Sequence, residues 1–561
     1  MKKKARYAEI RLVLGSLSLV VGFLAANLAL FQWVESTGVY YLFGAYARYV
    51  CAYGGFAAMI FGAMLVDDFL VMRKIAKKRL IAKDGLTMYC NVGREKEEKA
   101  VTRDRHKKER RKIAAASFAI FLTMYPIAYS LVSYTATVVI MPLSFTRSFI
   151  SYRSNTEVYL LNSPKERTWN GSAWSISETE MATAGSAVLW IRAAYCPNSS
   201  RRNEKIVVTL SSDDYLDAYV WNGSAWKVTN NIGQVNTAAG TYQSFDIAYE
   251  HTSGKVMLVY SVLSTDATRD LGYRIWNGTN WSNEAYIDDT GHSSHVNYRW
   301  VELESKPKNG FNEIALIAID IPNSDCNGWI WNGNTWGNYK ELENALAAVK
   351  DNKLMAVAYE QNSGKAMFAW GYNNYMESRR WNGTGWENEL SAISLGTLNV
   401  RWISMKADPA SNRLMAIVID GSSNLYSVYW DGNAWGSPVL HDDGVTHSDK
   451  RCADFDWEPI GSKGLLVWST AQNSVSYKTF TAPSTWSDPS TASNPGGHPW
   501  IQLRRNPKNG DVKILGATLN SNQYIFGFKW NGSALTFEAT AFTTDTTMIA
   551  YECFDIAFQQ S

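Results

Sequence analysis

The chain has 561 residues, with 55 Lys and Arg against 52 Asp and Glu, and it contains 23 Trp. Its positive charge is concentrated in the first 112 residues, so the remaining sequence is mildly acidic and offers no basic surface for a nucleic acid. The sequence lacks four motifs that mark common enzyme classes, namely Cys-x-x-Cys, His-Glu-x-x-His, a phosphate-binding loop and Gly-x-Ser-x-Gly. No motif therefore indicates any of those enzyme classes.

Three stretches within residues 1–150 predict transmembrane helices, at about 12–34, 49–66 and 113–142. Each is almost free of charge and long enough, at about 1.5 Å per residue, to cross a hydrocarbon core about 30 Å thick. For the second stretch, a buried helix of a water-soluble protein is the alternative. The fold class expected for this region is therefore α-helical, with the lipid bilayer as a partner.

Charge predicts the orientation of these spans. The segment 73–112 holds sixteen Lys or Arg against six Asp or Glu, and such basic loops remain in the cytoplasm. Three spans then place residues 151–561 outside the cell, as the extracellular part of a multi-pass plasma-membrane protein. Binding to anionic lipid head groups explains the loop, and a docking surface for a cytoplasmic partner is the alternative.

The rest of the chain, 151–561, repeats the phrase Trp-Asn-Gly-x-x-Trp about every fifty residues, each time after an alternating apolar stretch. Such a period with four strands per copy predicts a β-propeller, and eight copies predict eight blades. Asn-Gly between two strands further predicts a type I′ hairpin turn, with positive φ at both central residues. The first Trp of each clear copy is Trp169, Trp221, Trp276, Trp331, Trp381, Trp430 or Trp530.

The innermost strands come in two alternating types, which predicts four two-blade repeats. One type begins with Trp-Ile or Trp-Val, as at Trp190, and the other resembles the Phe-Asp-Ile-Ala-Tyr of 245–249, with Phe455-Asp456-Trp457 as one copy. The chain ends after 554–558, an inner strand without outer strands, whereas Trp169 follows outer-strand sequence only. Pairing of the N- and C-terminal strands would therefore close the ring and remove its free edges. The segment 156–161 would be the second or the third strand of that blade.

Packing between blades is the preferred explanation of the repeated Trp residues, because each indole can bury on the order of 200 Å². Ligand pockets are the alternative. The turns also create most of the seven Asn-x-Ser/Thr sequons, which would accept glycans on an exported domain. These sequons are at Asn170, Asn198, Asn222, Asn277, Asn280, Asn382 and Asn531.

Two similar loops, 288–295 and 441–447, hold most of the histidines of the propeller and would face one mouth of the central channel. His and Asp at a channel mouth could bind a metal, but the loops lie three blades apart, so we expect no metal site, no cofactor and no catalytic residues. The weak metal candidates are His292, His295, His441, His447, Asp289 and Asp443. Further acidic positions of the inner strands could face the channel, among them Asp246, Glu250, Glu302, Glu304, Asp456 and Asp555.

The phrases Phe-Asp-Ile-Ala-Tyr-Glu, Ser-Gly-Lys and Tyr-Arg-x-Trp-Asn-Gly-Thr-x-Trp resemble the repeats of large prokaryotic and archaeal surface proteins with Trp-Asn-Gly propeller blades. This resemblance covers about 155–561 and implies architecture only. The Ser-x-Asp-x-Gly-x-Thr-Trp box of sialidases is absent, and the spacing of Thr-Gly and Trp in quinoprotein dehydrogenases is not matched. Fungal fucose-binding propellers share the Tyr-rich strand and the Gly-x-x-Trp ending loosely.

These observations predict a membrane-anchored, non-catalytic propeller at the cell surface. The first hypothesis is a protein-interaction or assembly subunit of a surface layer, appendage or membrane complex, because three spans exceed what a tether needs and could pack against a partner or a second copy. The alternative is a carbohydrate-binding adhesin or lectin with glycan partners. An extracellular hydrolase is the third possibility.

Overall fold

The computed structural model describes residues 148–153, 163–181, 186–236, 242–321, 323–344, 346, 352–470, 474–494, 496–544, 546 and 549–559. The chain divides into two compact units, Met1–Met141 and Pro142–Ser561, and all described residues belong to the second unit.

The predicted fold class, an α-helical membrane region joined to a propeller, needs correction. Every element of the described part is a β-strand, apart from one 3-10 turn at Ser199–Arg201 (η1). No helix there combines the length and the apolar character that a membrane crossing needs. The segments 12–34, 49–66, 73–112 and 113–142 lie outside the described residues. An apolar run indicates hydrophobicity but does not by itself establish a helix, and the fold of the described residues is all-β.

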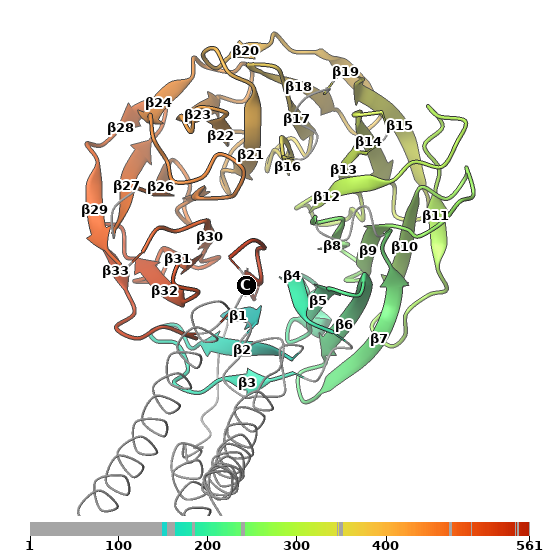
Figure 1. Cartoon of the computed structure of the whole chain (residues 1–561), viewed down its shortest axis with the longest axis horizontal. Coiled ribbons are helices and arrows are strands. Elements are labelled where there is room, and N and C mark those ends of the chain that lie inside the picture. Colours follow the sequence, from blue (N-terminus) through green and yellow to red (C-terminus); the bar gives the residue numbers. More distant parts are fainter. Residues whose placement is uncertain are drawn as a thin grey trace, which may run out of the picture. The chain divides into compact units, whose positions relative to one another are not determined.

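The described strands form eight antiparallel sheets, each with four strands in line from the axis outward, and two of them with one further short strand. Figure 1 shows the sheets arranged radially around a central axis. Each inner strand contacts the inner strands of both neighbouring blades, all the way around the ring. The described part of the chain is therefore a closed β-propeller.

Four blades, which we call tryptophan blades, have an inner strand with Trp near its start. Their strands are β4 (Val188–Tyr195), β5 (Lys205–Ser211), β6 (Tyr215–Trp221) and β7 (Trp226–Gln234); β12 (Tyr298–Ser305), β13 (Ile314–Asp320), β14 (Cys326–Trp331) and β15 (Trp336–Glu343); β21 (Val400–Ala407), β22 (Leu414–Asp420), β23 (Leu425–Trp430) and β24 (Val439–Asp442); and β30 (Trp500–Arg505), β31 (Ile514–Leu519), β32 (Ile525–Trp530) and β33 (Leu535–Phe537).

The other four, the intervening blades, alternate with these around the ring. Their strands are β8 (Phe245–Tyr249), β9 (Val256–Ser261), β10 (Leu271–Trp276) and β11 (Ala285–Ile287); β16 (Met355–Tyr359), β17 (Ala366–Tyr372), β18 (Tyr375–Trp381), β19 (Trp386–Glu389) and β20 (Ile393–Ser394); β25 (Ala453–Trp457), β26 (Lys463–Ser469), β27 (Ser474–Thr481), β28 (Thr485–Trp486) and β29 (Ser490–Ser493); and β34 (Phe554–Phe558), β1 (Ser148–Arg153), β2 (Pro164–Trp169) and β3 (Thr179–Glu180).

The last of these sheets contains both ends of the propeller sequence, in the order β3-β2-β1-β34. Strand β34 pairs antiparallel with β1, from Ser148 opposite Phe558 to Tyr152 opposite Phe554. The predicted closure by terminal strands is thereby confirmed. The second strand is β1 and the third is β2, whereas residues 154–162, which include the predicted 156–161 strand, lie outside the described residues. The predicted domain boundary at 150 falls inside β1.

The Trp-Asn-Gly turns differ from the predicted type I′ geometry. In the first copy only Gly171 has positive φ, at 98°, and Asn170 does not. Instead, the Asn170 Oδ1 accepts hydrogen bonds from the backbone N–H groups of Ser172 and Ala173, both at 2.9 Å. The Asn side chain thus accepts hydrogen bonds from the N–H groups of the turn, so the turn does not need positive φ at both central residues. The same pattern recurs at Asn222, Asn277, Asn332, Asn382, Asp431 and Asn531.

The Trp residues of these repeats pack between blades. The two Trp rings of a copy meet at 5.4–5.7 Å between centroids, as Trp430 and Trp435 do. Trp430 also donates from Nε1 to Glu360 of the preceding blade at 2.9 Å. Trp331 and Trp530 donate to Glu250 and Glu458 in the same way. Each of these three indoles therefore joins two sheets by burial and by one hydrogen bond to a carboxylate.

Candidate functional site

Four Trp residues form a ring around the axis of the propeller. Trp190, Trp300, Trp402 and Trp500, one from each tryptophan blade, lie edge-to-face with centroid separations of 5.6–5.9 Å around the complete circle. All four are at most 4% exposed. Edge-to-face pairs add about 0.5–1.5 kcal/mol each beyond their burial. The sequence placed these residues at equivalent strand positions but did not reveal that they meet.

Two tyrosines pack on this tryptophan ring from the loops that enter the intervening blades. The Tyr242 ring lies 5.6 Å from Trp300, and the Tyr551 ring lies 6.0 Å from Trp190. These loops connect the outer strand of one blade to the inner strand of the next. The aromatic cluster therefore closes the channel on the side where the inner strands begin.

A cavity of about 190 Å³ lies on the other side of the tryptophan ring. Trp402 forms part of its wall, together with side chains that lie two or four positions after a ring Trp, namely Arg192, Glu302, Glu304, Ser404, Lys406 and Arg504. Five lining residues are cationic and five are acidic. They are Arg192, Lys353, Lys406, Arg451 and Arg504 with Asp246, Glu302, Glu304, Glu552 and Asp555. This axial cavity is therefore strongly polar but carries no net formal charge.

Most of these charges are paired with one another. Arg192 contacts Glu552 at 3.2 Å, and Arg504 contacts Asp555 at 3.0 Å. Arg451 donates from Nε to Glu552 at 2.8 Å. Lys353 forms an ion pair with Glu302. Because these pairs link residues on, or just before, the inner strands of different blades, they fix the wall of the cavity in place.

Three buried aspartates also connect neighbouring inner strands. Asp246, Asp454 and Asp555 occupy the same position of the intervening blades and accept hydrogen bonds from the backbone N–H groups of Leu303, Leu503 and Ala193. The strand is Ala453–Trp457, so the predicted alignment of Phe455 with Phe245 was shifted by two residues. Asp454, not Asp456, is the equivalent of Asp246.

Two charged groups of the cavity remain without such partners. In the described part of the chain, the side chains of Glu304 and Lys406 form neither a hydrogen bond nor an ion pair within 4 Å. Desolvation by the surrounding protein, opposed by Lys406, raises the pKa of Glu304 to about 7, although the residue is exposed to solvent. Desolvation and Arg504 lower the pKa of Lys406. These two groups are available to a ligand.

The predicted channel-facing acids are only partly in the cavity. Asp246, Glu302, Glu304 and Asp555 line it. Glu250 instead accepts the Trp331 indole hydrogen bond, and Asp456 accepts from the backbone N–H of Arg505 at 2.7 Å. The cations that balance the acids were missed, because Arg451 and Lys353 precede their strands and show no periodic signal.

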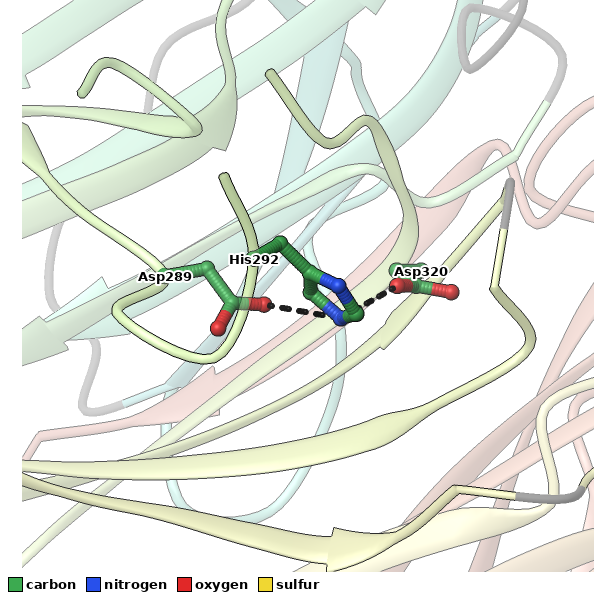
Figure 2. Close-up of side chains that lie close together, drawn as sticks. All are labelled: Asp289, His292 and Asp320. Atoms are coloured by element: carbon green, nitrogen blue, oxygen red, sulfur yellow. Dashed lines mark ion pairs between the residues drawn. The ribbon is translucent and has the colours of Figure 1, made fainter. Parts of the chain in front are cut away.

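The first histidine loop brings several predicted candidates together. His292 Nε2 lies 2.8 Å from Asp325, 3.8 Å from Asp320 and 3.9 Å from Asp289. Figure 2 shows His292 between Asp289, from its own loop, and Asp320, from the end of β13 in the next blade. Burial alone would lower the pKa of His292, but the three carboxylates outweigh it and raise the pKa. His295 pairs separately with Asp270 at 3.4 Å.

The second loop does not form an equivalent cluster. His441 contacts the Ser427 hydroxyl at 2.8 Å and packs on the Trp486 ring at 4.4 Å. Burial lowers the pKa of His441 to about 3. His447 is 3.9 Å from Asp449, and Asp443 is exposed. The similarity of the two loop sequences therefore does not extend to their surroundings.

The sequons and the cysteines can also be placed. Among the sequon asparagines, Asn198 is half-buried and donates to the Thr252 carbonyl at 2.6 Å. The other six are exposed. Four cysteines within the described ranges are buried, namely Cys196, Cys326, Cys452 and Cys553.

No protein-family model matches the chain, and no curated protein matches its sequence. Solved structures similar in fold include the BP39L lectin from Burkholderia pseudomallei, with 10% identity, a TM-score of 0.46, and coverage of 63% of this chain and 99% of the lectin. The six-bladed lectin of Aleuria aurantia has 12% identity, a TM-score of 0.34, and coverage of 65% and 98%. AofleA from Arthrobotrys oligospora has 10% identity, a TM-score of 0.34, and coverage of 66% and 90%.

At these identities the likeness concerns the propeller fold alone, and with TM-scores below 0.5 we base no functional conclusion on it. The resemblance to Trp-Asn-Gly surface proteins is not tested by these matches and stays a prediction.

Proposed function

We propose that the propeller is a non-catalytic carbohydrate-binding module that holds a neutral sugar residue in the axial cavity. The observation that carries the proposal is the cavity lining, where five cationic and five acidic side chains surround a space bounded on one side by an indole. A free sulfate, phosphate or ammonium group would meet as many repelling as attracting charges there. A neutral ligand with many hydroxyl groups meets a donor or an acceptor on every side.

Ring hydroxyls of a sugar both donate and accept hydrogen bonds. The unpaired Lys406 would donate to one hydroxyl, and the carboxylate of Glu304 would accept from another. Hydrogen bonds that involve a charged partner contribute about 1.5–3 kcal/mol each. Trp402 borders the cavity but is only 2% exposed, so hydrogen bonds to the charged lining, rather than stacking on the indole, would hold the sugar.

The same lining favours binding over hydrolysis. Glycoside hydrolysis normally uses two carboxyl groups on either side of the scissile bond. Here Glu552 is held by Arg451 and Arg192, and Asp555 by Arg504 and a backbone N–H group. Among the acids that line the cavity, only Glu304 is unpaired, so the lining does not provide the two available carboxyl groups that hydrolysis needs. The predicted assembly function depended on segments outside the described residues, whereas the proposal of glycan binding is supported by residues that the structure describes.

Binding of the full-length chain to an array of neutral and acidic glycans tests the proposal. We expect binding to neutral sugars, and Glu304→Ala or Lys406→Ala should weaken it at least about tenfold, because each variant removes one charged hydrogen-bonding group. Both side chains lack partners in the described structure, so these variants should leave the thermal midpoint nearly unchanged.

The matched control is Lys463→Ala, which removes an exposed lysine at the start of β26, outside the cavity. It should bind as the unaltered chain does. Failure to bind any neutral glycan would overturn the proposal, and so would binding that Glu304→Ala and Lys406→Ala leave unchanged.

A further inference from the structure

The carboxylates around His292 carry negative charge that the protein does not balance. Asp289 and Asp320 are fully buried, and Asp325 is 3% exposed. Throughout the described ranges, no Lys or Arg forms an ion pair with any of the three, and their one basic neighbour within 4 Å is the His292 imidazole. Buried charges are costly unless they are paired or coordinate a metal ion. The negative charge of three buried carboxylates beside one imidazole would therefore be balanced by a further cation.

The ligand atoms also lie close to the spacing of a coordination shell. Metal–ligand bonds of about 2.0–2.2 Å place neighbouring ligand atoms about 2.8–3.6 Å apart in octahedral or tetrahedral geometry. From His292 Nε2, the nearest oxygens of Asp325, Asp320 and Asp289 lie at 2.8, 3.8 and 3.9 Å. One atom each of Asp289, His292 and Asp320 lies within 4.8 Å of the other two. Small rotations of the side chains would complete a shell.

Surrounding groups hold two of these carboxylates in fixed orientations. Asp289 accepts hydrogen bonds from the Tyr298 hydroxyl at 2.6 Å and from the Asn327 amide at 3.1 Å. Asp320 Oδ1 accepts the backbone N–H of Asp325 at 2.9 Å. Its Oδ2 accepts the Asn323 amide at 3.2 Å and lies 3.8 Å from His292 Nε2 (Figure 2). Such outer contacts orient metal ligands and preserve their geometry.

From the unbalanced charge, the spacing and these supports, we infer that His292, Asp289, Asp320 and Asp325 form a site for one divalent transition-metal ion, Zn²⁺ or Mn²⁺. An imidazole nitrogen among carboxylates suits these ions better than Ca²⁺, which prefers an all-oxygen shell. The site would join the loop after β11 to the loop after β13 in the next blade. It is separate from the axial cavity, so it does not depend on the proposed sugar binding.

Isothermal titration of the EDTA-treated full-length chain with ZnCl₂ and with MnCl₂ tests this assignment. We expect one ion per chain for at least one of the two metals. His292→Ala and the isosteric Asp325→Asn should each weaken binding about tenfold or more, as loss of groups at metal sites does. The bound ion should also raise the thermal midpoint of the unaltered chain, because it binds the folded state.

His447→Ala is the matched control, because His447 lies in the similar loop without the converging carboxylates. It should bind metal as the unaltered chain does. Absence of stoichiometric binding of both ions would overturn the assignment. So would equal affinity in the unaltered chain and in both site variants, or a loss in His447→Ala as large as that in His292→Ala.

Discussion

At the scale of single residues, the surroundings of a histidine decide its chemistry more than its sequence context does. His292 and His447 come from similar loops, yet only His292 meets carboxylates from the next blade. His498, which the sequence shows only as another loop histidine, is fully buried and hydrogen-bonded to Thr518 at 2.5 Å. The loop sequence alone could not separate these cases, because the deciding partners are distant in the chain.

Burial lowers the pKa of His498 to about 4, whereas an unfolded histidine titrates near about 6.5. Between these values the unfolded chain binds more protons, so the stability that neutral His498 contributes is present above about pH 6.5 and is lost as the pH falls toward 4. We expect His498→Gln to reduce the acid-induced loss of stability by roughly 2 kcal/mol. Urea unfolding at pH 7.5 and pH 4.5 measures this, and equal losses in both proteins would contradict it.

At the scale of strands and blades, the closing sheet depends on the last inner strand. Phe554 and Ile556 of β34 are buried, and the strand pairs with β1 along five positions. Deleting 552–561 should leave β1 and the neighbouring inner strands with free edges and buried side chains exposed. We expect a lower thermal midpoint and aggregation, measured by calorimetry and light scattering.

The control for this deletion removes residues 560–561 alone, which follow the strand and lie outside the described residues. The chain with this shorter deletion should have the same thermal midpoint as the unaltered chain. A propeller that stays monomeric and equally stable without 552–561 would show that the terminal pairing does not close the ring in solution.

At the scale of the whole molecule, the tryptophan ring joins four blades that are not neighbours in the ring of eight. Trp402→Ala should destabilise the propeller by about 3–5 kcal/mol, because it removes a fully buried indole and leaves a cavity. Trp386, on an outer strand, is half-buried, so Trp386→Ala should cost less. Urea midpoints of the two variants measure the difference. Equal losses would mean that the axial ring adds nothing beyond ordinary inter-blade packing.

The sequence by itself determined the features that the repeat pattern and its incomplete ends express. The spacing of Trp-Asn-Gly predicted the number of blades, and the two strand types predicted their alternation. The incomplete ends predicted closure of the ring by terminal strands, although the strand that pairs with β34 is β1 and not the predicted 156–161. It misjudged the turn type, because the Asn170 side chain performs a role that backbone conformation was expected to perform. It also misaligned Phe455, since Asp occurs at two positions of that strand.

Only the tertiary structure decided what the blades build together. The circle from Trp190 to Trp500, the balance of charge around the axial cavity, and the approach of Asp320 to His292 each join residues from different blades. Such contacts depend on the packing of blades on one another, which brings separate segments to one axis or one loop cluster. Local periodicity predicts the blades because most strands pair with strands that are near in the sequence. A binding site cannot be predicted in this way, because its side chains meet only after the blades have packed together.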